Sequence, residues 1–301
     1  MKNNHHTSKA IFVALLSNLL IAIAKLFGFF ITKSASMLSE SIHSLADCAN
    51  QILLFIGLSR SKKLANSKFN LGHGREEFLW AFLVAIILFT MGSLFSLYEG
   101  ILHIMHPQPL ENLTVILVVL LIAILLEGYS FLQALKSKKS GQSLLTYLRK
   151  TSDSASAVVL IEDFAALIGL LSSFVFILLA KFVHPIFDGI GATVTGLVLG
   201  VLSIVLAIEL GNLIKGESLP EIDSGKIKML VKKENIVESV NSVESTIIGN
   251  NKYLIIVSVD PYGSDNGYSI EKISKRIKEI VNLLLPNSKV VVDFCRSEDK
   301  D

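Results

Sequence analysis

The chain contains a succession of apolar runs of about twenty residues or more, the length that an α-helix needs to cross roughly 30 Å of hydrocarbon. Hydrophobic residues make up 51% of the 301 residues and charged residues only 18%, which is unlike a soluble domain. The sequence therefore predicts a mainly α-helical, polytopic membrane protein with about six transmembrane helices. The runs lie near Ile11–Ile31, Ala35–Leu58, Phe78–Leu102, Leu113–Leu135, Ala155–Phe182 and Ile186–Leu210.

The first run follows a short polar start, and no small-residue cleavage site comes after it, so a retained span is expected and not a removed signal peptide. Basic residues gather in two alternating connections, after the second run and after the fourth, and these connections are expected to be cytoplasmic. With an even number of spans, both termini are then cytoplasmic. A bacterial inner membrane or an organellar membrane is the expected location. The basic residues are Arg60, Lys62, Lys63, Lys68, Arg75, Lys136, Lys138, Lys139, Arg149 and Lys150.

Charged residues alternate with short apolar runs near the end of the chain. This change divides a transmembrane domain, residues 1–215, from a small cytoplasmic domain, residues 216–301. Periodicity and turn residues predict the order α-β-β-α-β for the second domain. A domain of roughly eighty residues gains stability from self-association, so a homodimer is expected. The predicted elements are Glu221–Glu234, Val240–Ile248, Tyr253–Val259, Ser269–Leu285 and Val290–Phe294.

Polar side chains form a stripe inside the second apolar run. Glu40, His43, Asp47 and Asn50 fall on one side of a helix, because they are spaced by three or four residues. Ionisable groups at membrane depth cost several kcal/mol on most estimates and usually mark a pathway or a site. A neutral imidazole beside a carboxylate is typical of a site for a divalent transition metal. The alternative is that the stripe only joins helices by hydrogen bonds.

Several other functions are disfavoured by composition. Cys48 and Cys295 are the two cysteines, and they provide neither a disulfide framework nor a zinc-finger spacing. The net charge of +2 is too small to indicate a nucleic-acid partner. No enzymatic cofactor is expected.

A set of short motifs, in order along the six runs, resembles the cation diffusion facilitators, proton-coupled exporters of divalent metals, and above all their zinc transporter 9-like branch. The resemblance implies that spans one, two, four and five surround the ion path, that spans three and six support them, and that two chains pair through their cytoplasmic domains. The motifs are Ser36 to Gln51, Leu71-Gly-His-Gly-Arg-Glu-Glu77, Tyr98-Glu-Gly100, His106-Pro107, Leu160-Ile-Glu-Asp-Phe-Ala-Ala166 and Gly216-Glu-Ser218.

The resemblance implies a metal site built from two residues of span two and two of span five, each pair at i, i+4. His43 and Asp47 match the first pair, and Asp163 matches the second carboxylate. Val159 stands four residues before Asp163, where the family has its fourth ligand, and valine cannot bind a metal. One imidazole and two carboxylates suit Zn²⁺, Mn²⁺, Fe²⁺ or Co²⁺.

The fourth ligand is therefore open. Glu162 is adjacent to Asp163, but neighbours on a helix diverge by about 100°, so it shares the site only if span five is rotated or bent there. Water, Glu40 or Asn50 are the alternatives. The predicted metal residues are His43, Asp47, Asp163 and Glu162.

Three further ionisable residues in the spans have two interpretations each. Glu127 in span four is either a relay carboxylate or a structural one. Asp188 is either a relay carboxylate or a cap, and because it follows His184-Pro185 it is expected to cap its own helix from the interface. Lys25 in span one is expected either to hydrogen-bond across helices or to extend its ammonium group towards the membrane surface.

The secondary sites that many members of the family carry are not expected here. His73 lies between spans two and three, but Asn66 and Phe69 stand where other ligands would be, so His73 is expected to be structural. The residues after Leu219 include no histidine, so the second domain is expected to serve dimerisation.

Together these patterns and the resemblance predict an exporter of a divalent metal, with zinc as the first candidate. It is expected to work as a homodimer by alternating access with proton exchange. The first alternative is an integral-membrane metalloenzyme in which His43, Asp47 and Asp163 activate water. No catalytic motif accompanies these residues, so an enzyme is not expected. The second alternative is a non-transporting metal sensor or scaffold, which Val159 makes credible.

Overall fold

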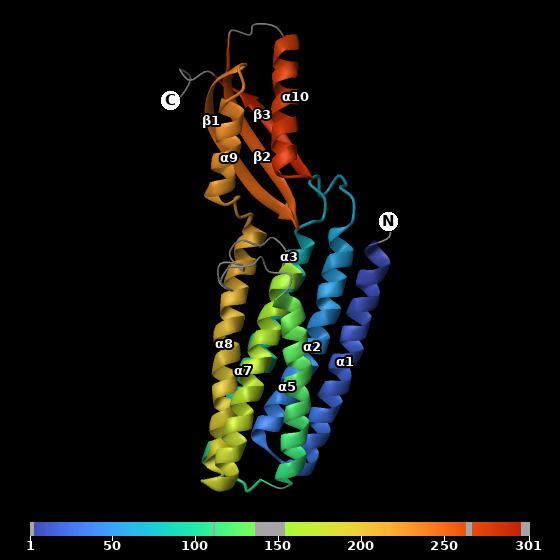
Figure 1. Cartoon of the computed structure of the whole chain (residues 1–301), viewed down its shortest axis with the longest axis vertical. Helices are drawn as coiled ribbons and strands as arrows, with labels where there is room; N and C mark the ends of the chain where they lie inside the picture. The colour runs from blue at the N-terminus through green and yellow to red at the C-terminus, as the bar shows by residue number, and fades with distance from the viewer. Residues whose placement is uncertain (1–2, 111, 136–153, 263–266, 296–301) are drawn as a thin grey trace. The chain divides into compact units, whose positions relative to one another are not determined.

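The computed structural model of the chain (Figure 1) describes residues 3–110, 112–135, 154–262 and 267–295, with side chains in the first helix from Asn18 onward. The chain divides into two compact units. The first, here called the membrane unit, comprises Met1–Ser59 and Leu79–Gly211. The second, here called the sheet unit, comprises Arg60–Phe78 and Asn212–Asp301. The loop that follows the second predicted span therefore groups with the C-terminal residues.

Long helices make up the membrane unit. Five helical stretches in the described residues are long and apolar enough to cross a membrane, and Asn18–Thr32, the part of the first helix whose side chains are described, is a shorter apolar helix. The predicted polytopic helical fold is confirmed, and the first of the six spans stays a prediction. The helices are α1 (Asn3–Thr32), α2 (Ala35–Ser61), α3 (Glu76–Ile87), η1 (Leu88–Leu94), α4 (Phe95–Met105), α5 (Leu113–Leu135), α7 (Ser154–Phe182) and α8 (Ile186–Lys215).

The third span is continuous but changes its winding, because α3 passes through the π-helical turn η1 into α4. It packs closely against α8, where small residues face each other. Ser93 donates to the carbonyl of Gly196 at 2.8 Å, and a Cβ at Gly100 would lie only 2.8 Å from the carbonyl oxygen of Gly189. Small residues allow such approach between membrane helices. Spans three and six are thus in contact, as the family resemblance implies.

The start of α2 is held by Asp188 from the first turn of α8. Its carboxylate accepts hydrogen bonds from Ser34 Oγ at 2.8 Å and from the backbone N–H of Ala35 at 2.6 Å. The first N–H groups of a helix have no partner within it, so a carboxylate satisfies them well. The expectation that Asp188 caps its own helix is corrected. At the start of α8, His184 Nδ1 instead accepts from the N–H of Ile186.

The sheet unit has the order α-β-β-α-β that the sequence predicts. Strands β1 and β2 form an antiparallel hairpin, and β3 lies parallel to β2 on its other side. Asn251 takes a positive φ of 51° in the hairpin turn, a conformation that asparagine tolerates. The elements are α9 (Glu221–Lys232), β1 (Val237–Gly249), β2 (Lys252–Pro261), α10 (Gly267–Leu284) and β3 (Ser288–Phe294).

One apolar core holds these elements together. Ile255, Val257 and Val259 alternate along β2 and point to one face, where they join Ile227 of α9 and Ile277 of α10. All five side chains are completely buried. The two helices therefore cover the same face of the sheet.

Side chains in the segment Arg60–Phe78 of the sheet unit form hydrogen bonds with strand β1 and with each other. Arg75 donates to Thr246 Oγ1 at 2.9 Å and to the carbonyl of Ile247 at 3.2 Å. His73 Nδ1 lies 2.6 Å from Glu76 Oε1, and its ring packs against Phe69 with 4.7 Å between centroids. His73 thus has the structural role that its sequence context predicts.

Candidate metal site

The polar stripe of α2 is buried inside the membrane unit. Glu40, His43 and Asn50 are at most 1% exposed, and Asp47 is 6% exposed. His43 Nε2 lies 3.7 Å from Asp47 Oδ2. This separation is too long for a hydrogen bond, but it is near the roughly 3.4 Å that separates two ligands of one tetrahedral zinc ion. The predicted i, i+4 pair is therefore arranged so that one ion can contact both residues.

Several atoms of this stripe have no hydrogen-bond partner in the described part of the chain. They are both ring nitrogens of His43, Oδ1 of Asp47, Oδ1 of Asn50 and Oε1 of Gln51. A buried polar atom without a partner costs about 1–3 kcal/mol, so a cluster of them indicates a site and not packing alone. Imidazole nitrogens and carboxylate or amide oxygens are also the atoms that coordinate divalent metals.

The two predicted carboxylates of α7 point in different directions. Glu162 accepts a hydrogen bond from Asn50 Nδ2 of α2 at 2.7 Å. Asp163 accepts one from Ser130 Oγ of α5 at 2.8 Å. Adjacent residues on a helix diverge by about 100°, which agrees with the different hydrogen-bond partners of the two carboxylates. The α7 carboxylate that reaches the stripe of α2 is thus Glu162, whereas Asp163 faces α5.

The structure brings together only part of the predicted ligand set. His43 lies with Asp47, and Glu162 lies with Asn50. Within the residues that the structure describes, no three His, Cys, Asp or Glu side chains are close enough together to hold a metal ion. The assignment of His43, Asp47, Asp163 and Glu162 as one complete site therefore stays a prediction.

Sequence reasoning left one partner of the site region open and missed another. Lys25 of α1 donates to Glu40 Oε2 at 3.2 Å and to Ser44 Oγ at 2.8 Å, and its side chain has no exposed surface. Of the two expectations for Lys25, hydrogen bonding across helices is the observed one. The sequence gives no indication of the contact between Ser130 and Asp163, because a lone serine in an apolar span carries no signal of its partner. Glu127 is 6% exposed and precedes Ser130 by one turn of α5, and its relay role stays a prediction.

Comparison with known proteins identifies the group to which the membrane unit belongs. A family model described as "Cation efflux transmembrane domain" matches residues 11–213. The chain belongs to the cation efflux family. Its polytopic membrane fold agrees with that membership.

Relatives of the chain agree with this family. Metal tolerance protein C4 of Arabidopsis thaliana is 28% identical over 264 residues, which are 86% of this chain and 58% of the relative. The mitochondrial proton-coupled zinc antiporter SLC30A9 of Xenopus laevis is 30% identical over 84% of this chain and 46% of its own length. The human protein of the same name is 28% identical over 84% of this chain and 45% of its own length. The chain spans about half the length of the curated relatives it matches.

These matches confirm the resemblance on which the site residues were assigned. They cover the spans that carry the polar stripe and the α7 carboxylates, because the family match extends from residue 11 to residue 213. A transporter family is also consistent with the expectation that this chain is not an enzyme.

Proposed function

We propose that this chain exports a divalent metal ion from the cytoplasm in exchange for protons, with zinc as the first candidate for the metal. The observation that carries the proposal is the buried stripe of α2, where His43 and Asp47 lie 3.7 Å apart with unpartnered atoms. A charged ion in the middle of a bilayer needs such polar ligands, since lipid provides none. Two relatives named as proton-coupled zinc antiporters support both the metal and the coupling.

The proposed ligands are His43, Asp47, Asp163 and Glu162. His43 and Asp47 contact the ion together. Glu162, held by Asn50 at 2.7 Å, supplies a carboxylate from α7, and Asp163 joins when α7 turns towards α2 and releases Ser130. This rotation of α7 changes the carboxylates that face α2, and so changes the ligand set. The rotation of one helix thereby gives alternating access a physical basis.

Proton coupling follows from the chemistry of these ligands. A metal ion binds to a neutral imidazole and to ionised carboxylates, so protons and metal compete for the same atoms. Protonation on the far side of the membrane weakens metal binding and releases the ion. A partly open ligand set, with Val159 in the fourth position, also favours release, because tight binding would stop conduction.

The two units have separate roles in this proposal. The membrane unit carries the ion, and the sheet unit pairs two chains into a homodimer. The proposed domains are residues 1–215 and 216–301, with the loop Arg60–Phe78 of the first grouped with the sheet unit, and both termini are proposed to lie in the cytoplasm. The membrane is a bacterial inner membrane or an organellar one, and the relatives named as mitochondrial support the second.

The test is metal flux in sealed proteoliposomes that carry a zinc-sensitive dye and a pH-sensitive dye inside. The proposal predicts zinc entry that is driven by a pH gradient and accompanied by a proton signal of opposite direction. It also predicts that zinc affinity weakens as the pH falls, and that His43→Ala flattens this dependence.

Each other outcome identifies a different function. Zinc movement without a proton signal at every pH would indicate facilitated diffusion and overturn antiport. No zinc movement, with zinc still bound to the protein, would indicate a sensor or scaffold. A chemical change in an added substrate without flux would indicate the metalloenzyme.

A further inference from the structure

The membrane unit contains an ion pair that the proposed ligand set does not use. Lys25 of α1 lies 3.2 Å from Glu40 of α2, and neither side chain has any exposed surface. Removing two charges from water costs several kcal/mol per ion, and an apolar replacement of such a pair is often as stable. Stability alone therefore does not explain why the pair is there.

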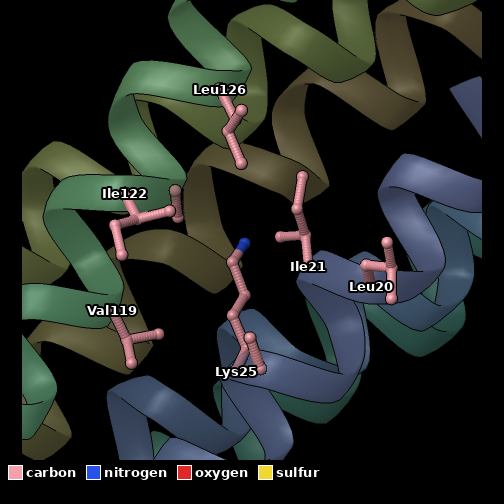
Figure 2. A pocket seen from close by; sticks show the side chains of 8 residues that line it. Leu20, Ile21, Lys25, Val119, Ile122 and Leu126 are labelled. Carbon is pink, nitrogen blue, oxygen red and sulfur yellow. The ribbon is translucent and has the colours of Figure 1, made fainter.

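The Lys25 charge also acts at longer range on the carboxylates of Asp47 and Glu127, but its close contacts are few. The Lys25 side chain lines a cavity of about 380 Å³ between α1 and α5 (Figure 2). The other residues that line the cavity are leucine, isoleucine, valine and alanine. Among the described contacts, the ammonium group donates to Glu40 and, at 2.8 Å, to Ser44 Oγ. Ser44 is the residue next to His43. The positive charge is thus fixed beside the transport stripe.

The carboxylate of Glu40 is held from two sides. Its Oε2 atom accepts from Lys25, and its Oε1 atom lies 3.5 Å from Ser173 Oγ of α7. A Cβ added at Gly169 of α7 would come within 2.7 Å of Oε1. Helix α7 therefore approaches Glu40 closely at Gly169, which has no side chain. Helices α1, α2 and α7 together enclose the carboxylate.

Glu40 and the transport residues lie on one stripe but differ in their partners. Both ring nitrogens of His43 and Oδ1 of Asp47 have no hydrogen-bond partner among the described residues. Both carboxylate oxygens of Glu40, by contrast, have a hydrogen-bond partner. Glu40 precedes His43 by three residues, so its carboxylate is one helical turn from the proposed ligands and within their electrostatic range.

We propose that Lys25 is a tethered cation that neutralises Glu40 and keeps this carboxylate out of the ligand set of the transported ion. The inference rests on the proposed transport function. With Lys25 in place, an arriving ion meets the charges of Asp47 and the α7 carboxylates but not that of Glu40. The lysine thereby limits how tightly the ion is bound and allows its release.

The experiment measures Zn²⁺ binding to the purified full chain in lipid nanodiscs. Lys25→Met removes the charge, and Lys25→Gln removes it while keeping a donor for Glu40 and Ser44. Both variants are expected to bind Zn²⁺ at least about tenfold more tightly, since a close unpaired carboxylate attracts a divalent ion strongly. The double variant Lys25→Met with Glu40→Gln is expected to return to the parent affinity. Lys181→Met, at an exposed lysine of α7, is the matched control.

A second measurement separates this role from simple joining of helices. Zinc efflux from preloaded proteoliposomes is expected to slow in both single variants, because release becomes limiting, and to recover in the double variant. Co²⁺ absorption spectra are expected to change in the single variants as an oxygen ligand is added. A pair that only joins helices would change neither.

Each outcome decides the inference. A parent protein that binds no Zn²⁺ overturns the proposed function and this inference with it. A parent that binds Zn²⁺, with single variants of parent affinity, overturns this inference alone. Failure of both single variants to fold, with recovery of the double variant, assigns the pair to helix assembly and also overturns it.

Discussion

The sheet unit is held by one apolar cluster and buries two carboxylates, Glu77 and Asp260, whereas the membrane unit buries more ionisable side chains between its helices. In the first, Ile227, Ile255, Val257 and Ile277 meet in one cluster. In the second, buried ionisable residues come from α1, α2, α5, α7 and α8. They are Lys25, Glu40, His43, Asp47, Glu127, Glu162 and Asp188.

The difference follows from the two solvents. In water, burying apolar area drives the sheet unit together at about 25 cal/mol per Å². In lipid, apolar helices gain little by leaving an equally apolar environment, so small residues and hydrogen bonds join them. Charged groups there are costly and are kept for a function. The contrast therefore assigns stability to the apolar cluster of the sheet unit, and it is consistent with the proposed ion handling by the polar stripe of α2.

The largest expected effect is on the core of the sheet unit. Ile255→Ala removes a completely buried side chain, and we expect a loss of about 2–5 kcal/mol from the free energy of unfolding. Hydrogen exchange measured by mass spectrometry should quicken in β1 and β2 and stay unchanged in α2 and α7. The control is Val291→Ala on β3, where the side chain is 44% exposed. Equal effects of the two variants would contradict a single apolar core.

A smaller effect is expected where a charge in the membrane unit is structural. Asp188→Ala leaves Ser34 and the N–H of Ala35 without their acceptor, which should cost about 1–3 kcal/mol. Thermal unfolding should begin at a lower temperature, and exchange should quicken at the start of α2. Asp223→Ala, at an exposed carboxylate of α9, should change little. An unchanged α2 in the Asp188 variant would show that this contact does not hold the helix.

The smallest effect concerns the open fourth position of the site. Val159→His adds an imidazole four residues before Asp163, and we expect zinc to bind roughly tenfold more tightly, about 1.4 kcal/mol. Val175→His lies about 160° around α7 from Val159 and should leave affinity unchanged. Competition between zinc and manganese measures the effect. Identical profiles for both variants and the parent would mean that Val159 does not face the ion.

Most of the fold was predictable, because apolar runs and periodicity determine helices and strands locally. The predicted order of the sheet unit is the observed one, although β1 begins at Val237 and not at Val240. Helix α8 ends at Lys215, beyond Leu210, where the predicted apolar run ends. The π-helical turn Leu88–Leu94 gave no sequence signal, since its apolar residues suit any buried helix.

Less of the site was predictable, because contacts between helices depend on how each helix is rotated. The spacing of His43 and Asp47 was sufficient to place them together on α2. The spacing of Glu162 and Asp163 left open which of them faces α2, and the structure assigns Asn50 to Glu162 and Ser130 to Asp163.

A signal for the Lys25–Glu40 pair was present in the sequence. Lys25 lies eight residues before Lys33, and Glu40 lies six residues after Ser34, on either side of the break between the first two helices. Antiparallel helices joined there hold the two side chains at a similar depth. An intramembrane lysine needs a partner of opposite charge, and the same depth in the next helix is the place to look for it.

The most direct test of the central claim is the amount of zinc bound per chain in lipid nanodiscs. The variants to compare are Asp47→Asn, which removes a charge from the stripe, and Glu99→Gln, which removes one from α4 beside His103. Our account predicts that the parent and Glu99→Gln bind zinc equally and that Asp47→Asn, although folded, loses this binding. Unchanged zinc binding in Asp47→Asn would contradict the assignment of the polar stripe of α2 as the transport site.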